Sequence, residues 1–536
     1  MCKKEAALLI LSTFKHNHSY YAHNLLFDFL MILEGLIHFN VKFNWIFIDY
    51  LLYGVKIIYK EKIFKLKCSY KLIPKPLKDF YPFISSFKKM YFPYYLLNTW
   101  NPDLLCSIDN NIDKIYENIT LDEYLKIYAL NDSYILLDGI LNFWKNLKKI
   151  GIEYNENIYT CGAISLKYYI KYWNLINLNL DKNIIKQIRK SYYGGRCEVF
   201  GNSYKNEKIY HYDFPGMYQQ CMLEKLPYDN YEFVVLNNSS YIDYPGFYYI
   251  KINYIANLPV LPIKTDKLYF KEGYVEGWYW WEEINLTIKS NKILNLNILY
   301  GILCHSYDYI LKEFIDKLNK IKLQGGIMKD IGKLLINSFY GRMAINEKMN
   351  IIKLSLTKDK KIYGIIGNYY ITKVEKKKKI KSNIAISSAI TSKSRIKLYN
   401  EFSNVINNKG KLLYCDTDSI FATFPIIENM SATKINFDKN IKDAVFIGPK
   451  SYGILFNNKE EIIKIKGFNN IKLKFKTIKL KFYNKKILES NTILFTKKNL
   501  NINIINKWKY MKTDNYNKRI WKKNFKNTIP YKSTPY

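Results

Sequence analysis

A chain of 536 residues with 48% hydrophobic content can bury several cores, which excludes a disordered tail and predicts three or more globular subdomains. The 83 Lys and Arg residues outnumber the 46 Asp and Glu residues, and the net charge of +37 favours a polyanionic partner such as nucleic acid. No membrane partner is expected, because even the most apolar region, after Asn24, carries Asp28, Glu34 and Lys42.

Cysteine spacing and residue usage bear on the cellular compartment. The eight cysteines form no Cys-x-x-Cys pair, which argues against a zinc ribbon or a disulfide framework and favours a reducing compartment. The chain is rich in Lys, Asn, Ile and Tyr, as AT-rich coding produces, and organelle genomes are commonly AT-rich. No Arg-rich amphipathic presequence begins the chain, so a mitochondrial location would imply synthesis in the organelle.

In chain order, the predicted elements alternate between helix and strand. Apolar spacing predicts a long helix at Leu121–Trp144 and later helices at Lys329–Tyr340 and Ile384–Tyr399. Alternating or β-branched and aromatic residues predict strands at Lys208–Phe214 and Lys411–Phe424. The expected fold class is therefore α+β.

The first of these strands carries a candidate acid. Asp213 lies at the end of the strand pattern in KIYHYDFPGMYQQCM, and Pro215 and Gly216 favour a turn before Tyr218. An aspartate at the end of a strand is ordinary when it stands alone. Its meaning depends on the motifs that follow it along the chain.

The helix at Lys329–Tyr340 has a basic and polar face. Lys329, Lys333, Asn337 and Tyr340 fall at i, i+4, i+8 and i+11, which places them on one side of the helix. Such a face is usually only solvated. This one includes a tyrosine and lies in the chain between two acidic strands, so it is a candidate binding surface.

The segment YCDTDS is the strongest local signal in the sequence. Asp416 and Asp418 stand two residues apart inside a strand pattern, and a hairpin would hold both carboxylates beside one cation-binding spot. A structural calcium turn or an accidental acidic turn would show the same local pattern. The companion motifs decide between these interpretations.

Together the three motifs resemble, in order and spacing, the palm and fingers motifs of family B DNA polymerases. SYYGGR supplies Tyr192, Gly194 and Gly195, which resemble the YxGG element between exonuclease and polymerase domains. GPKSY supplies Lys450 and Tyr452, which resemble the downstream KxY motif. The resemblance extends over most of the chain.

The first palm motif departs from the general DxxSLYP form of the family. Gly216, Met217 and Gln219 replace Ser, Leu and Pro, and the form DFxGMYxQCM resembles polymerases of linear mitochondrial plasmids in the protein-primed branch. The departure therefore marks a subgroup. It leaves in doubt the triphosphate contact made at the Ser position.

The resemblance implies a right-hand fold of palm, fingers and thumb, preceded by an RNase H-like 3′-5′ exonuclease domain. The implied boundaries are 1–185 for the exonuclease-like domain, 186–300 for palm with a first insertion, 301–345 for fingers, 346–430 for palm with a second insertion, and 431–536 for thumb and C-terminal region. The chain offers no linker, so these boundaries rest on the motifs alone.

The same resemblance implies the catalytic roles. Nucleotidyl transfer uses two Mg²⁺ ions, for which Mn²⁺ is the alternative, and the ligands would be Asp213 and Asp418, with Asp416 close by as the third catalytic acid. Lys333 would hold the incoming triphosphate. Tyr218 would lie under the sugar and exclude a 2′-hydroxyl.

The remaining matched residues would bind nucleotide and DNA. Asn337 and Tyr340 would line the nascent base pair. The glycines of the YxGG loop allow close approach to template phosphates. Lys450 and Tyr452 would hold the primer strand. The expected partners are template and primer DNA and deoxynucleoside triphosphates.

The N-terminal part resembles a proofreading exonuclease that is incomplete. Asn24 and Asp28 match the second exonuclease motif, and Tyr128 and Asp132 match the third. The first motif, Asp-x-Glu, is missing, because Glu5 is the only acid before Asn24. We expect weak or absent proofreading, unless the true start of the protein lies upstream of this sequence.

Protein-primed members of the family carry insertions on either side of the fingers motif. Here the first would lie around Leu226–Gly301 and the second around Asn346–Lys381, where they would contact a terminal protein and encircle DNA. No terminal-protein domain precedes the exonuclease remnant, so the priming hydroxyl is expected from another polypeptide. The implied function is replication of a linear mitochondrial plasmid or of its integrated copy.

Two rival classes fit parts of the pattern. A reverse transcriptase would normally show a Tyr-x-Asp-Asp turn, whereas Thr417 separates the two acids here. A catalytically decayed DNA-binding relic of a plasmid polymerase would keep the basic composition. The survival of all three palm acids favours an enzyme.

Overall fold

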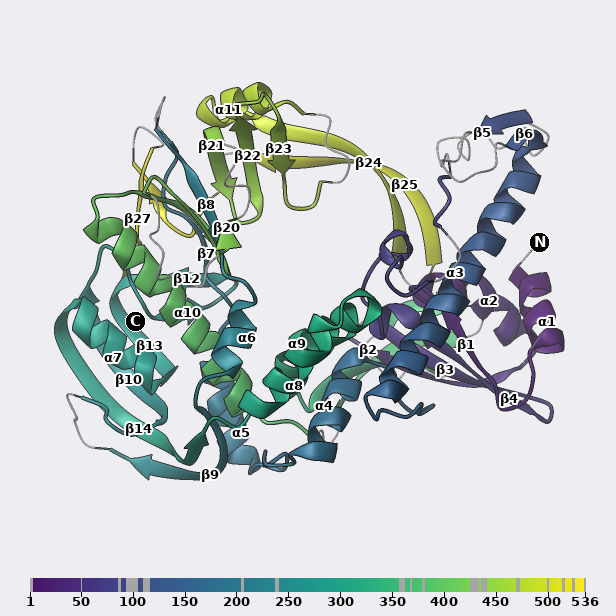
Figure 1. Ribbon diagram of the computed structural model, residues 1–536, viewed down its shortest axis with the longest axis horizontal. Coiled ribbons are helices and arrows are strands. Elements are labelled where there is room, and N and C mark those ends of the chain that lie inside the picture. Colours follow the sequence, from purple (N-terminus) through teal and green to yellow (C-terminus); the bar gives the residue numbers. More distant parts are fainter. Residues whose placement is uncertain are drawn as a thin grey trace.

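The computed structural model (Figure 1) places two groups of strands at opposite ends of the molecule, joined by helices and by one long hairpin. It describes residues 3–49, 51–84, 88–92, 105–108, 116–203, 207–236, 241–355, 362–366, 369–377, 381–424, 433–434, 441–468, 473–498, 501–512, 516–522 and 526–534. Within these ranges no helix is long and apolar enough to cross a membrane.

The N-terminal unit is a seven-stranded sheet in the order β1-β4-β3-β2-β15-β17-β16. The elements of this unit are α1 (Lys3–Thr13), β1 (Ser19–Ala22), α2 (Leu26–His38), β2 (Lys42–Ile48), β3 (Leu51–Tyr59), β4 (Lys62–Cys68), β15 (Lys348–Ser355), β16 (Ile362–Ile366) and β17 (Tyr369–Lys377). Ile48 pairs with Ile351, and the Trp45 indole donates to the Ile352 carbonyl at 2.9 Å. The strands of the second predicted insertion thus extend the N-terminal sheet.

A long helix leads from this unit toward the centre of the molecule. The predicted helix is confirmed as α3 (Leu121–Lys149), which begins with a capping box of Thr120 and Glu123 and runs five residues past its expected end. Ile135, Phe143 and Leu147 face the main core. The following short elements are α4 (Cys161–Tyr172), α5 (Lys182–Ile188) and the 3₁₀ turn η4 (Arg189–Ser191).

The first predicted insertion forms a sheet of its own, hereafter the insertion sheet, in the order β28-β13-β10-β14-β9. Its strands are β9 (Leu226–Val235), β10 (Gly246–Ile255), β13 (Glu272–Trp280), β14 (Lys292–Asp308) and the C-terminal β28 (Lys532–Ser533). Helix α7 (Trp281–Ser290) covers one face, where Ile284 packs against Ile250 and Tyr279 in a second core.

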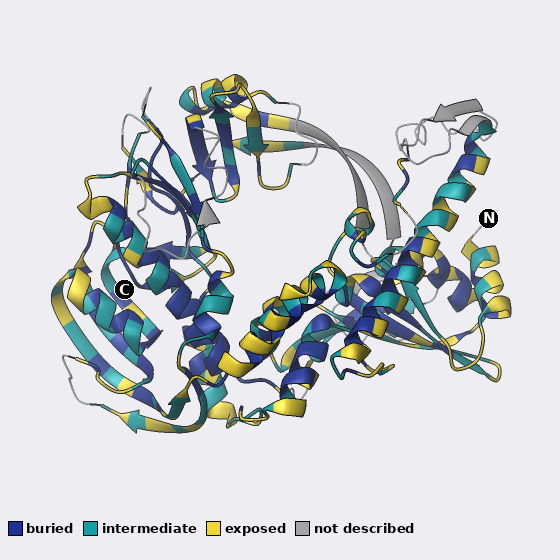
Figure 2. Cartoon of the chain, viewed as in Figure 1, coloured by how far each residue is buried: buried dark blue, intermediate teal, exposed yellow. Residues whose placement is uncertain are grey.

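Three helices lie between the two ends of the molecule. α8 (Lys312–Leu323) and α9 (Gly326–Met343) form an antiparallel hairpin whose turn contains Gly325 and Gly326, both with positive φ. α10 (Ile384–Asn407) confirms the third predicted helix and is buried along most of its length. Figure 2 shows α9 with exposed residues along one side, the side that carries the predicted polar face.

The predicted acidic strands meet in a five-stranded sheet, hereafter the carboxylate sheet, in the order β20-β8-β19-β18-β7. The strands are β7 (Cys197–Val199), β8 (Tyr210–Asp213), β18 (Leu412–Asp416), β19 (Ser419–Ala422) and β20 (Thr433–Lys434), and α6 (Met217–Met222) follows β8. The expected hairpin at YCDTDS is confirmed, because Asp416 pairs with Ser419.

The C-terminal region begins beside the carboxylate sheet and reaches toward the N-terminal unit (Figure 1). Its main elements are β21 (Ile441–Gly448), β22 (Ser451–Phe456), β23 (Glu461–Lys464), α11 (Phe475–Tyr483), β24 (Ile487–Lys498) and β25 (Asn501–Lys512). The hairpin of β24 and β25 spans the distance, and β25 contacts α2.

Candidate active site

The three predicted acids meet at one end of the carboxylate sheet. Ser419 pairs with Asp213 on one neighbouring strand and with Asp416 on the other. The backbone N–H of Phe214 donates to the carbonyl of Asp418 at 2.7 Å, which ties the end of β8 to the hairpin turn. Residues about 200 positions apart in the chain therefore form one acidic site.

The turn that carries Asp418 is held by the glycine-rich loop. Thr417 adopts a φ of 62°, and its N–H donates to the Arg196 carbonyl at 2.7 Å. A Cβ on Gly195 would lie 2.8 Å from the Thr417 methyl group, so a side chain there would displace the turn. Nothing lies within 4 Å of a Cβ on Gly194, which leaves that backbone accessible.

The electrostatics of the acids favour a cation between them. Burial raises the pKa of Asp213 to about 6, and the nearby Asp418 carboxylate adds to the shift. Burial also raises the pKa of Asp418, with Asp416 adding and Lys450 opposing. Lys450 Nζ lies 3.7 Å from Asp416 Oδ2. A divalent cation at Asp213 and Asp418 would relieve this mutual repulsion.

Three tyrosines from separate segments gather at α6, the helix that follows Asp213 in the chain. The rings of Tyr218 and Tyr340 lie 4.5 Å apart between centroids at 32°. Burial raises the pKa of Tyr192 to about 12, and its hydrogen bond to Tyr340 acts in the same direction. The loop before β7, the helix after β8 and α9 therefore share one aromatic cluster.

The exposed face of α9 adds positive charge. Lys329, Lys333 and Asn337 are all exposed on it. Lys322, on the neighbouring α8, has its pKa lowered by burial and then by Lys333 and Lys329, so the three amines are close in space. Lys322 Nζ also donates to Gln219 Oε1 at 3.3 Å. The sequence pattern identified Lys333 but not Lys322, because only the folded helical hairpin brings Lys322 to this face.

The family description DNA polymerase type B, organellar and viral, matches residues 10–437. The chain belongs to this family. Among curated relatives, a probable DNA polymerase of Podospora anserina is 24% identical over 495 residues, which are 79% of this chain and 41% of the relative. The DNA polymerase of Bacillus phage phi29 is 24% identical over 326 residues, 57% of this chain and 53% of the relative.

The fold agrees with the family. Phi29 DNA polymerase complexed with primer-template DNA superposes with a TM-score of 0.72 and 19% identity, covering 92% of this chain and 91% of that chain. The mixed α/β right-hand fold is therefore shared. By sequence, the matched part of the chain spans about two fifths of the length of the Podospora relative and about half of the length of the phage relative.

The chemistry of Asp213 and Asp418 fits a Mg²⁺ site whose other positions would be filled by water or phosphate oxygens. No group of three His, Cys, Asp or Glu side chains placed to hold a metal ion occurs in the described ranges. Mg²⁺ is commonly bound by one or two carboxylates, with water and phosphate oxygens filling the other positions. Asp213 and Asp418 meet that requirement as hard oxygen donors.

A buried ion pair supports the glycine-rich loop. The Arg395 guanidinium makes two hydrogen bonds to the Glu283 carboxylate, at 2.7 and 2.8 Å, and both side chains are buried. Arg395 also donates to the carbonyls of Tyr193 and Gly194 at 3.0 and 3.1 Å. This pair was not predicted from the sequence, although an Arg within the apolar helix predicted at 384–399 indicates a buried charge that needs an acidic partner.

The predicted KxY motif lies behind the acidic hairpin. Lys450 adopts a φ of 57°, and its N–H donates to the Tyr414 hydroxyl at 2.9 Å. The rings of Tyr452 and Tyr414 lie 5.6 Å apart. Through Tyr414 on β18, the motif is fixed relative to Asp416.

The predicted exonuclease acids lie on two helices, Asp28 on α2 and Asp132 on α3. Asp132 pairs with Lys89, whose Nζ lies 2.7 Å from Asp132 Oδ2 and also contacts the Tyr128 hydroxyl. Our reading of the sequence missed Lys89. Asp28 lies in the first turn of α2 beside a hollow of about 120 Å³, and Asn24 precedes α2 with a φ of 69°.

Proposed function

We propose that this chain is a DNA-directed DNA polymerase that uses two-metal-ion nucleotidyl transfer. The observation that carries the proposal is the convergence of Asp213, Asp418 and Asp416 at one sheet end, beside Tyr218. Membership of the type B family supports the same reaction. The Bacillus phage phi29 relative is named as a DNA polymerase.

Each group at the site has a chemical task in this proposal. Mg²⁺ held by Asp213 and Asp418 would activate the primer 3′-hydroxyl and neutralise charge on the phosphates. Lys333 and Lys322 attract the triphosphate and its pyrophosphate product. Tyr218, whose ring lies tilted against that of Tyr340, limits the space beneath the sugar. The accessible backbone at Gly194 admits template phosphates.

Protein priming and a mitochondrial plasmid origin are part of the proposal. The motif at Asp213 has the form of mitochondrial-plasmid polymerases, and the composition is that of AT-rich coding. The insertion sheet and the strands β15–β17 supply surfaces for a terminal protein that donates the priming hydroxyl. The N-terminal unit would be an exonuclease-like domain with little proofreading activity.

Primer extension on a defined template tests the proposal. The purified chain with Mg²⁺ and dNTPs should extend a DNA primer according to the template, and Asp213→Asn should abolish extension while retaining DNA binding. Asp243→Asn, at an exposed acid of the insertion sheet region, is the matched control and should extend normally.

The negative outcomes separate the alternatives. A folded wild-type chain that binds DNA but never extends a primer would favour the decayed relic. Extension by Asp213→Asn at the wild-type rate would show that the acidic site is not the catalytic one. Transfer of a single labelled deoxynucleotide to a candidate terminal protein would test protein priming directly.

A further inference from the structure

Aromatic side chains cross one face of the insertion sheet in a row. Tyr300 pairs with Tyr249 on the next strand, and Tyr249 pairs with Trp278 on the strand beyond. Phe233 lies on the outer strand of the same sheet, with its ring 5.8 Å from that of Tyr300 at 24°. The ring centroids of Tyr249 lie 6.0 Å from Tyr300 and 5.8 Å from Trp278. These four residues are named the aromatic row.

The outer part of the aromatic row faces solvent. Phe233 is 48% exposed and Tyr300 is 40% exposed, and Val235, opposite Tyr300 on β9, is 70% exposed. The row lines an open hollow of about 590 Å³. Helix α7 packs on the opposite face of the sheet, through Tyr279. Exposed neighbouring rings of this kind mark an interaction surface.

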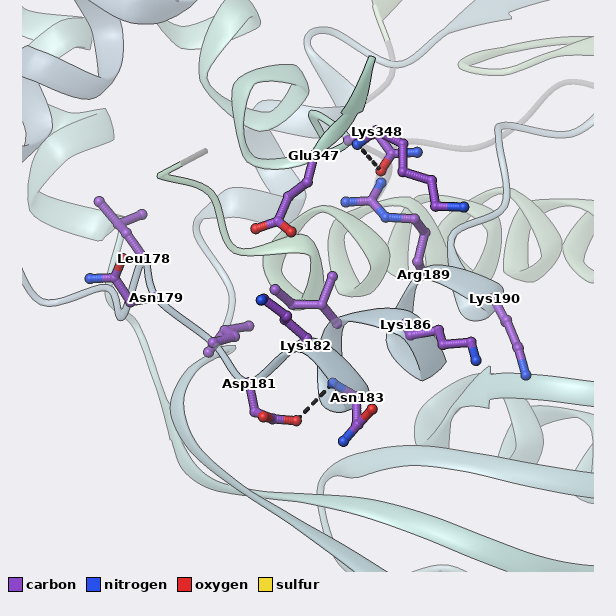
Figure 3. Close-up of a pocket in the computed structure, with 13 residues that line it drawn as sticks. Leu178, Asn179, Asp181, Lys182, Asn183, Lys186, Arg189, Lys190, Glu347 and Lys348 are labelled. Atoms are coloured by element: carbon purple, nitrogen blue, oxygen red, sulfur yellow. Dashed lines mark hydrogen bonds between the residues drawn. The ribbon is translucent and has the colours of Figure 1, made fainter. Parts of the chain in front are cut away.

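Lysines line the same hollow. Lys190 and Lys251 both contribute to it. Lys190 also lines a second, neighbouring groove of about 1090 Å³. Lys182 and Lys186 of α5 lie along that groove, and Figure 3 shows Lys186 and Lys190 side by side at one end of it.

The charges around these lysines leave them available for a polyanion. Within the described ranges, four of the lysines that line the two hollows form no ion pair with an acid; they are Lys182, Lys186, Lys190 and Lys251. Arg189 is different, because its guanidinium donates to the carbonyls of Ala344 and Ile345 at the end of α9. Glu276 on β13 lies directly opposite Lys251 in the strand register, and its carboxylate accepts from the Tyr274 hydroxyl at 2.8 Å. Glu347 lines the second groove and lies near Arg189.

The aromatic row is continuous with the proposed active site. Lys190 immediately precedes the loop of Tyr192 and Gly194, and η4 contacts β13 of the insertion sheet. The Tyr193 ring stacks on Tyr279, on the opposite face of the sheet, at 5.5 Å and 17°, so the loop meets the aromatic row through Lys190. A strand that leaves the glycine-rich loop would therefore meet Lys190 first and the rings next.

We propose that Phe233 and Tyr300 of the aromatic row, with Lys190 and Lys251, bind single-stranded DNA by stacking unpaired bases on their exposed rings. Bases in a duplex are already stacked on each other, so only unpaired bases can cover exposed rings. The lysines then lie where backbone phosphates would run. This inference rests on the proposed polymerase function and names a path for unpaired template outside the acidic site.

Binding of a fluorescent oligothymidylate without Mg²⁺ or dNTPs tests the inference. The double variant Phe233→Ala with Tyr300→Ala should bind about tenfold more weakly. Tyr300→Phe, which keeps the ring, should bind as the wild type does. Tyr81→Ala is the matched control, because Tyr81 is 75% exposed in the N-terminal part, and it should leave binding unchanged.

Salt dependence provides a second measurement that does not require removal of any ring. The double variant Lys190→Gln with Lys251→Gln should lower the slope of log affinity against log salt by about one to two. Unchanged binding by the ring variant, or an equal loss in Tyr81→Ala, would overturn the inference. So would a wild-type dimer that becomes monomeric in the ring variant, because the row would then be an interface between copies.

This test is independent of the polymerase test. Asp213→Asn should bind oligothymidylate as the wild type does. If the wild type extends primers but the ring variant binds normally, only the aromatic-row inference fails. If ring-dependent binding is present but no extension occurs, only the proposed function fails.

Discussion

The carboxylate sheet and the N-terminal sheet show two different fates of acidic motifs. In the carboxylate sheet, Asp213 and Asp416 both pair with Ser419, and burial, with a further contribution from Asp418, raises the pKa of Asp213. Asp132 on α3, which contacts β1 of the N-terminal sheet, forms an ion pair with Lys89. A cation is favoured where neighbouring carboxylates repel one another, as Asp213 and Asp418 do, whereas the ammonium of Lys89 already balances the charge of Asp132.

The largest expected effect compares the two regions directly. Asp418→Asn should lower the rate of primer extension by about 10³-fold, because one metal-ligand charge is worth several kcal/mol in the transition state. Asp132→Asn should change extension less than about twofold, since its partner is Lys89. Single-turnover extension measures both, and an equal loss in the two variants would remove the distinction between the regions.

A smaller effect is expected at the aromatic cluster. Tyr218→Ala or Tyr218→Val should reduce the preference for dNTPs over rNTPs by roughly 10- to 100-fold, or about 1.4–2.7 kcal/mol. The ring that packs against Tyr340 is lost, and with it the proposed barrier to a 2′-hydroxyl. Competitive incorporation gives the ratio. Tyr218→Phe should retain the preference, whereas an equal loss of both activities would make Tyr218 a packing residue.

Asp213 should also affect the stability of the metal-free protein. Its folded pKa of about 6 exceeds the ordinary value of 3.8, so ionised Asp213 destabilises the fold above pH 6, and this cost vanishes below pH 3.8. Asp213→Asn should raise Tm by roughly 1–3 °C at pH 8 in EDTA and by nothing near pH 3.5. Thermal unfolding at the two pH values measures this, and a larger gain at the acidic pH would contradict the sign.

The smallest expected effect is a null result in the N-terminal unit. A primer with a mismatched 3′ end, Mg²⁺ and no dNTPs should not be shortened, because Asp28 and Asp132 supply too little ligand charge for two ions. Asp132→Ala should therefore match the wild type on a sequencing gel. Efficient removal of the mismatch that Asp132→Ala abolishes would show a functional exonuclease.

Local patterns predicted the elements well because the signals are local. Helix α3 and the hairpin at Asp416 follow from spacing within one segment. Helix α10 runs eight residues past its expected end at Tyr399, because Phe402 and Val405 continue the apolar face.

The missed features depend on contacts between distant segments. Arg395 reaches the loop at Tyr193, and Lys322 reaches Gln219. No spacing rule within one segment encodes either contact. The alternation of apolar residues also cannot show that β15 pairs with β2, because it predicts a strand without predicting which strand lies next to it.

The joint between β2 and β15 has a consequence for synthesis of the chain. Trp45 and Ile352, which are hydrogen-bonded across it, lie 307 positions apart. At 5–20 residues per second, a ribosome needs roughly 15–60 s to produce the partner of β2. During that interval β2 is an open sheet edge that exposes Ile46, and its exposed Lys42 is the residue type that discourages pairing with another nascent chain.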